Sequence, residues 1–258
     1  MVSDWWALWL LGLYLGITLI APRILARPPL VWKHPRAVAL WWIASLLIAL
    51  LALTLGLGVL IARAVSHHVT HIHGHEWLWP LIDSILGWVA IGIVGIIAFR
   101  LGVAGAELRA ENRSRNEQLS RLATTASLQN VHGYNVLIVD SPLKLVGVIT
   151  HVKKILVTTA LLETLSPAQL SAALAHEQAH LAGHHAALLT LGELAERSAA
   201  GFSASRRMAQ AMRITTELIA DDKAAQRVDS ATVANALELS YADNPLVAER
   251  VLRLRARS

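Results

Sequence analysis

The sequence predicts a predominantly α-helical membrane protein, in which three transmembrane helices precede an α+β domain with a small sheet and an H-E-x-x-H helix. All nine Trp residues lie between Trp5 and Trp88, and only nine charged residues precede residue 105. Short β-branched runs separated by turn residues follow residue 130. We therefore expect a membrane domain at residues 1–104, a linker helix at 105–130 and a second domain at 131–258.

Three apolar segments are long enough to cross a bilayer, which takes about 20 helical residues. They cover about residues 5–22, 37–62 and 77–99, and Asp83 is the one charged residue inside them. The basic residues gather in the loop after the first segment and after the third, whereas the loop between the second and third has only Arg63 and Glu76. Because positive charge stays in the cytoplasm, we expect the N-terminus outside and residues 131–258 inside.

Two features of this membrane half have alternative interpretations. The outer loop "SHHVTHIHGH" either binds a divalent metal or is a solvated, pH-sensitive segment; its histidines are His67, His68, His71, His73 and His75. Asp83 is either functional, as acids inside membranes often are, or simply reaches the outer interface. Gly12 and Gly16 form a GxxxG pattern, which is a weak signal for helix contact.

Composition excludes some classes of function. The net charge of +5 divides almost evenly between the two halves, so neither half has the basic surface that nucleic-acid binding requires. The chain contains no Cys, which excludes disulfides and thiolate zinc sites. The oligomeric state is left open.

In the second domain, three runs at residues 134–140, 145–150 and 154–159 predict strands, and we expect "KILVTT" (154–159) to form an edge of the sheet. Ser166, Pro167 and Gln169 form a capping-box start for a helix that is expected to run to about Leu189. Two more helices are predicted at about 206–227 and 231–241, before a basic tail.

The first of these helices carries the residues for metal chemistry. His176 and His180 are one turn apart and can bind one Zn²⁺ ion, with Glu217 on a later helix as the third ligand. Glu177 is then the general base that takes a proton from a zinc-bound water. Asp221, one turn after Glu217, can accept a hydrogen bond from a ligand histidine. His184 and His185 are expected to lie at the surface or behind the ligands.

Residues 131–227 resemble the peptidase domain of the BlaR/MecR-type membrane metallopeptidases. The resemblance lies in "VDSP", "ALLETLS", "LSPAQLSAALAHEQAH" and "ELIADD". More distantly, H-E-x-x-H followed by E-x-x-x-D is similar to the HtpX-type and CAAX-prenyl-type zinc proteases. The resemblance implies a zincin-like fold, one catalytic zinc ion on His176, His180 and Glu217, Glu177 as base, Asp221 behind a ligand, and a bacterial cell-membrane location.

The sequence also departs from the antibiotic sensors of that family. We expect no penicillin-binding domain after Ser258, and the region between the two zinc-binding segments is too charged for a fourth span. No His follows His185, so Tyr241, Arg227 or Arg213 would have to stabilise the oxyanion.

The sequence is compatible with three functions, and a fourth is disfavoured. The leading one is an integral-membrane zinc endopeptidase that cleaves a cytoplasmic or membrane-proximal protein, by analogy a transcriptional repressor. Its alternatives are a quality-control protease for membrane proteins and a non-enzymatic, metal-responsive membrane receptor. A metal transporter is disfavoured, because the three spans carry almost no ligands at mid-membrane depth.

Overall fold

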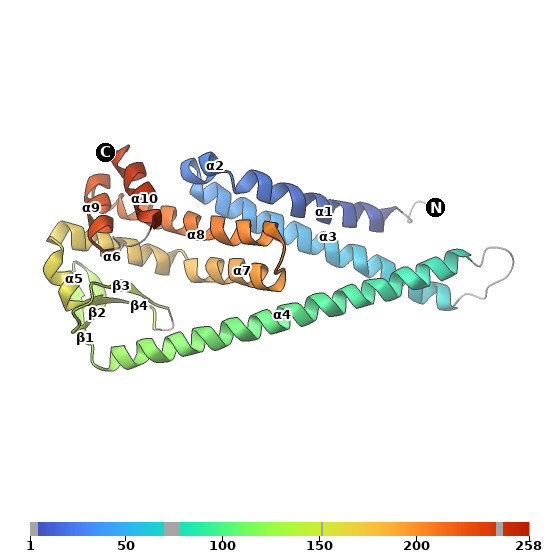
Figure 1. Cartoon of the computed structure of the whole chain (residues 1–258), viewed down its shortest axis with the longest axis horizontal. Coiled ribbons are helices and arrows are strands. Elements are labelled where there is room, and N and C mark those ends of the chain that lie inside the picture. Colours follow the sequence, from blue (N-terminus) through green and yellow to red (C-terminus); the bar gives the residue numbers. More distant parts are fainter. Residues whose placement is uncertain (1–4, 70–77, 151, 241–244, 258) are drawn as a thin grey trace.

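The computed structural model describes residues 5–69, 78–150, 152–240 and 245–257. Three long helices, α1 (Trp6–Leu25), α3 (Pro35–Val69) and α4 (Leu78–Thr124), run side by side, and a short α2 (Pro28–Lys33) joins the first two (Figure 1). Each long helix contains a segment long and apolar enough to span a membrane. Trp9, Trp88 and Phe99 are 74%, 70% and 72% exposed, which suits contact with lipid. The predicted three-helix membrane half is thus confirmed.

The third span and most of the predicted linker form one continuous helix, α4, which runs along most of the length of the molecule (Figure 1). At its outer end Asp83 is buried and forms an ion pair with Arg63 of α3, with Nη2 and Oδ2 3.2 Å apart. Asp83 therefore joins two membrane helices rather than reaching the interface alone. Gly87 allows the same close approach, because a Cβ there would collide with the Cβ of Ala64.

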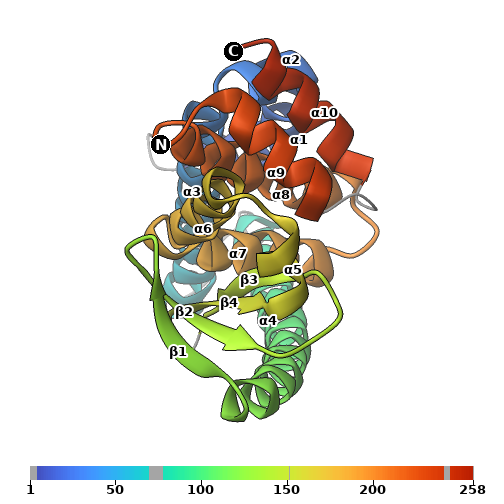
Figure 2. The same ribbon diagram turned by 90° about the vertical axis from the view of Figure 1, so that its left-hand side faces the viewer.

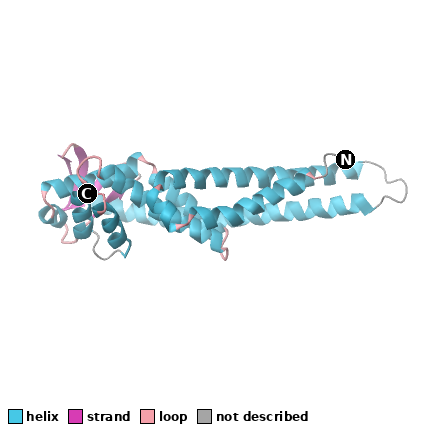
Figure 3. Cartoon of the chain, turned by 90° about the horizontal axis from the view of Figure 1, so that it is seen from above, coloured by secondary structure: helices cyan, strands magenta, loops and turns pink. Residues whose placement is uncertain are grey.

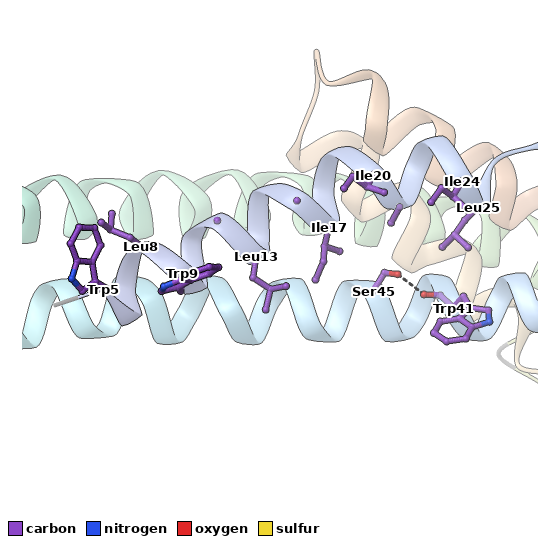
Figure 4. Close-up of a pocket in the computed structure, with 13 residues that line it drawn as sticks. Trp5, Leu8, Trp9, Leu13, Ile17, Ile20, Ile24, Leu25, Trp41 and Ser45 are labelled. Carbon is purple, nitrogen blue, oxygen red and sulfur yellow. Dashed lines mark hydrogen bonds between the residues drawn. The ribbon is translucent and has the colours of Figure 1, made fainter. Parts of the chain in front are cut away.

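Gly12 and Gly16 do not contact a neighbouring helix, since a Cβ at either position would meet nothing within 4 Å among the described residues. Instead they line an apolar groove of about 880 Å³ along α1 and α3 (Figure 4). Of the histidines predicted in the outer loop, His71, His73 and His75 lie outside the described residues, and the side chains of His67 and His68 are not described either.

The C-terminal half contains a four-stranded sheet in the order β1-β2-β4-β3. Its strands are β1 (Ser127–Val131), β2 (Tyr134–Val139), β3 (Val146–Ile149) and β4 (Lys154–Thr158). The β2–β4 pair is parallel and the other two pairs are antiparallel. Figure 3 shows all strands at the end of the molecule far from the N-terminus.

Two expectations for this sheet were wrong. The segment 154–159 is not an edge strand, because β4 pairs with β2 on one side and β3 on the other. Its four buried residues also fit a central position. The edges are β1 and β3. The linker helix stops at Thr124, and β1 occupies residues that were expected to continue it, because polar "SLQN" gave no strand signal.

Six helices complete the C-terminal half: α5 (Thr159–Thr164), α6 (Pro167–Ala182), α7 (His185–Ser198), α8 (Ser203–Ala224), α9 (Ser230–Ser240) and α10 (Pro245–Arg255). The helix expected at 167–189 is broken at Gly183 and His184, so it forms α6 and α7. The expected basic tail is helical, because Val247, Val251 and Leu254 bury one apolar face of α10. In Figure 2 the sheet lies on one side of α6, and α9 and α10 lie on the other.

Helix α8 connects the two halves of the molecule. Met208, Ala211 and Met212 of α8 share a buried apolar cluster with Val38 and Trp42 of α3. Around this core, Arg253 donates a hydrogen bond to the backbone oxygen of Trp32 at 3.0 Å. Arg197 of α7 forms a bidentate pair with Glu111 of α4, with both N–O distances 2.7 Å. The C-terminal half therefore packs directly against the three long N-terminal helices.

Candidate metal centre

Helix α6 positions the H-E-x-x-H motif in the centre of the C-terminal half. The Ser166 hydroxyl accepts from the backbone N–H of Gln169, and the Gln169 side chain accepts from the backbone N–H of Ser166, as the sequence predicts. The helix is then buried from Ala172 to Glu177 and packs against β3, α8 and α9. A burial this complete explains why the positions around the motif are small or apolar.

The first two candidate ligands come from one face of α6 and the third from α8. The Nε2 atoms of His176 and His180 are 3.1 Å apart. Glu217 places Oε2 3.5 Å from His176 Nε2 and Oε1 3.5 Å from His180 Nε2. These three residues form the group whose ligand atoms converge within 4.8 Å. Two helices that are distant in the sequence thus bring together the residues predicted from it.

This spacing fits a zinc ion. Ligand atoms about 2.1 Å from a tetrahedral Zn²⁺ lie about 3.4 Å from one another. The two Nε2 atoms are 3.1 Å apart, and each lies 3.5 Å from a different oxygen of Glu217. Two imidazole nitrogens and one carboxylate oxygen are also a ligand set that zinc accepts, with a fourth position left for water. Side-chain exposures of 15% for His180 and 31% for Glu217 leave one side of the group accessible.

Asp221 lies behind His176, on the side away from the converging atoms. Its Oδ1 is 3.0 Å from His176 Nδ1, although the ring nitrogen does not point squarely at the carboxylate. Asp221 is completely buried, one turn after Glu217 on the same face of α8. A carboxylate in this place favours a proton on Nδ1, which leaves Nε2 of His176 free to bind a metal.

Arg250 is the main residue that the sequence analysis missed. It comes from α10, is 3% exposed, and donates from Nε and Nη2 to the two oxygens of Asp221 at 2.8 and 2.7 Å. Its Nη1 is 2.8 Å from Oε2 of Glu217. One guanidinium therefore holds both carboxylates of α8 in place. The sequence signal that could have revealed Arg250 is its position on the apolar face of α10, between Val247 and Val251. A charge buried there is too costly unless it is paired, so the pattern indicates a buried acidic partner.

The charges of this cluster perturb four pKa values. Burial disfavours the imidazolium of His176, but Asp221 and Glu217 outweigh it and raise the pKa to about 10. Burial, together with the charge of His176, lowers the pKa of His180 to about 4. For Glu217 and Asp221 burial acts upward, but His176 and Arg250 outweigh it and lower each pKa to about 2. At neutral pH both carboxylates are charged. Of the two candidate histidine ligands only His176 is an imidazolium, and a metal must displace its extra proton.

His185 lies behind His180, which is one of the two positions expected for it. It is 2% exposed, and its Nδ1 lies 2.9 Å from Nδ1 of His180. Burial lowers the pKa of His185 to about 4, so its ring is neutral. Its Nδ1 can then accept a hydrogen bond from the Nδ1–H of His180, which directs Nε2 of His180 toward Glu217. The adjacent His184 is exposed and adopts a left-handed backbone conformation with φ of 51°.

Gly183 makes the position of His185 possible. A Cβ at residue 183 would lie 2.6 Å from Cδ2 of the His185 ring and 2.9 Å from the backbone oxygen of Ala179. The break between α6 and α7 therefore turns His185 back over α6. Helical periodicity places His184, not His185, on the face of His180, so the sequence alone does not show which of the two lies behind this ligand.

The other residues predicted for the site are Glu177 and the three candidates for stabilising the oxyanion. Glu177 is 6% exposed and close enough to His176 to raise its pKa. Tyr241 lies outside the described residues. Arg213 is 2.7 Å from Glu196, and Arg227 is exposed at the end of α8. The oxyanion-stabilising residue therefore stays a prediction.

The fold and this centre define a class: a membrane-associated metallopeptidase, with a possible metal site of two histidines and one glutamate between two helices. Residues 109–247, more than half of the chain, match Peptidase family M48. The chain belongs to this family, whose members are metal-dependent and include the BlaR/MecR, HtpX and CAAX-protease-like peptidases. No curated protein and no solved structure matches the chain significantly.

Replacing Arg250 tests the buried charge cluster. Arg250→Met leaves Asp221 and Glu217 buried without their cation, so the free energy of unfolding falls by about 3–5 kcal/mol. Arg255→Met is the matched control, because Arg255 makes a half-exposed pair with Glu238 and its loss costs at most about 1 kcal/mol. Thermal unfolding in detergent, followed by circular dichroism, measures the difference. Equal effects of the two substitutions would contradict the role given to Arg250.

Replacing His185 tests whether it orients His180. His185→Ala weakens Zn²⁺ binding by about 10- to 100-fold, the range seen when the hydrogen-bond partner of a metal ligand is lost. His184→Ala, which removes the exposed neighbour, leaves the affinity near that of the wild type. Competition with a chromophoric chelator measures both, and similar affinities for the two variants would refute the assignment.

The raised pKa of His176 predicts how metal binding depends on pH. The proton on His176 is present below about pH 10 and lost above it. A metal needs the neutral ring, so binding at pH 7–8 releases about one proton and affinity rises about tenfold per pH unit. Calorimetry in buffers of different ionisation enthalpy gives the number of protons. A value near zero would show that His176 is already neutral.

Proposed function

We propose that this chain is an integral-membrane zinc endopeptidase that hydrolyses peptide bonds of a cytoplasmic or membrane-proximal protein. The observation that carries the proposal is the convergence of His176, His180 and Glu217 at distances suited to zinc, with Glu177 adjacent on α6. Glu177 favours an enzyme over a receptor with a structural metal, since a structural site needs no base beside it.

In this proposal His176, His180 and Glu217 hold the zinc ion. Bound there, zinc supplies Lewis acidity, which makes water more acidic and polarises the scissile carbonyl. Glu177 accepts the proton of the attacking water and delivers it to the leaving amine. Asp221 and His185 fix the proton on the outer nitrogen of each ligand histidine, and Arg250 holds both carboxylates of α8 in place.

The substrate would bind in an extended conformation along β3. This strand is an edge of the sheet, pairs with β4 on one side only, and packs beside α6. Backbone groups on an edge strand can pair with a peptide of any sequence. A peptide paired in this way would present its carbonyl groups to the neighbouring helix α6. β3 therefore replaces segment 154–159 as the candidate for substrate pairing.

The proposed substrate class and membrane topology are inferred from the sequence. The BlaR/MecR-type motifs support a regulatory protease that acts on a transcriptional repressor, and a quality-control protease is the rival within the same family. The basic loops after the first and third spans support an outside N-terminus and a cytoplasmic peptidase domain in a bacterial cell membrane. We propose no contact with nucleic acid, because neither half is strongly basic.

Replacing Glu177 tests the proposal. Glu177→Gln keeps the size of the side chain and the metal ligands but removes the base, so peptide hydrolysis falls by at least about 100-fold while Zn²⁺ still binds. Glu163→Gln, an exposed glutamate on α5, is the matched control and stays active. The N-terminal peptides of cells that express each form are compared. Zinc binding without any Glu177-dependent peptide would favour the receptor alternative.

A further inference from the structure

A basic cavity lies between the end of α1, helix α2 and the first half of α8. Its volume is about 370 Å³, and its polar lining consists of Arg23, Arg27, Arg207 and Gln210, without a carboxylate among the described lining residues. Trp32 and Val31 add an apolar wall. We propose that this cavity binds the headgroup of an anionic phospholipid from the leaflet next to the peptidase domain.

The three arginines of the cavity lack the neutralising partners that other arginines of the molecule have. Arg197, Arg213 and Arg257 each lie 2.7 Å from a carboxylate oxygen. In the part of the chain that the structure describes, the side chains of Arg27 and Arg207 form no ion pair or hydrogen bond. Arg23 donates only to the backbone oxygen of Leu19, at 2.9 Å. Three uncompensated positive charges around one cavity form a site for an anion.

The cavity lies at the depth of lipid headgroups. Arg23 and Arg27 directly follow the apolar part of α1. On the other side, Arg100 ends the apolar part of α4 and donates to the backbone oxygen of Ser198 at 2.6 Å, close before α8 begins. Phe202, at the start of α8, is 68% exposed. Basic pockets beside membrane helices at this level select acidic lipids.

A path for the acyl chains runs beside the cavity. The apolar groove of about 880 Å³ between α1 and α3 extends along α1 from Trp9 past Gly16 to Leu25, within the turn that carries Arg23 (Figure 4). A diacyl lipid can therefore place its phosphate among the arginines and a chain along the groove. This arrangement favours an anionic lipid over a soluble phosphate as the ligand.

The bound lipid would contact the helix that carries the metal centre. Ala211 and Ile214 of α8 line the cavity, and Glu217 follows Ile214 by about one turn. A ligand that binds only the folded chain raises its stability according to its concentration and affinity. Lipid binding should therefore raise the unfolding temperature of the whole C-terminal half, and this effect does not depend on any peptidase activity.

The test is native mass spectrometry of the delipidated full chain in detergent, titrated with phosphatidylglycerol and, separately, phosphatidylcholine. The wild type binds phosphatidylglycerol saturably and phosphatidylcholine weakly. Arg27→Ala/Arg207→Ala binds phosphatidylglycerol about 25-fold more weakly, or about fivefold per arginine. Arg109→Ala/Arg206→Ala removes the same charge from exposed side chains outside the cavity and keeps wild-type binding.

Three results would overturn the proposal: equal losses in the two double variants, equal binding of the two lipids, or displacement of phosphatidylglycerol by inorganic phosphate at a similar concentration. The first shows general charge attraction, the second a lack of headgroup selectivity, and the third a site for a small anion. Arg27→Gln and Arg207→Gln each alter one exposed side chain and each weaken binding about fivefold. Phosphatidylglycerol raises the unfolding temperature of the wild type and of Arg109→Ala/Arg206→Ala, and at the same concentration it raises that of Arg27→Ala/Arg207→Ala less.

Discussion

The buried contact between Arg250 and the two carboxylates of α8 is the interaction on which the candidate centre depends. Asp221 and Glu217 are charged at neutral pH, and burying such charges is favourable only when they are paired. Arg250 supplies the cation from α10, and His176 supplies a proton from α6. Three helices are thus tied together by charge, and a metal that replaces the proton on His176 enters a cluster that is already built.

Helix α8 links the N-terminal helices to this charge cluster. Its first half packs against the end of α1 and the start of α3, and its second half carries Glu217 and Asp221. The position of the third candidate ligand, Glu217, therefore depends on how α8 packs on the N-terminal helices. A short, charged α7–α8 hairpin can thus connect the H-E-x-x-H motif to Glu217 without a fourth span.

Local signals in the sequence were enough for much of the fold. The three apolar helices, three of the four strands and the capping box of α6 follow from hydropathy, β-branched runs and the Ser166–Gln169 pair. What failed depended on long-range packing. The polar strand β1 forms because β2 pairs with it, and β4 is central because β3 folds back onto it. Arg250 reaches its partners only because α10 packs near α8. The sequence left open whether His184 or His185 lies behind a ligand, because the break at Gly183 was not foreseen.

The most direct test of the central claim is zinc K-edge X-ray absorption of the zinc-loaded chain, compared with Glu217→Ala. The account predicts two imidazole nitrogens and oxygen ligands at about 2.0–2.2 Å in the wild type, and a changed first coordination sphere in the variant. An identical spectrum for the two proteins, or a sphere with three imidazoles, would show that Glu217 is not a ligand and would contradict the centre described.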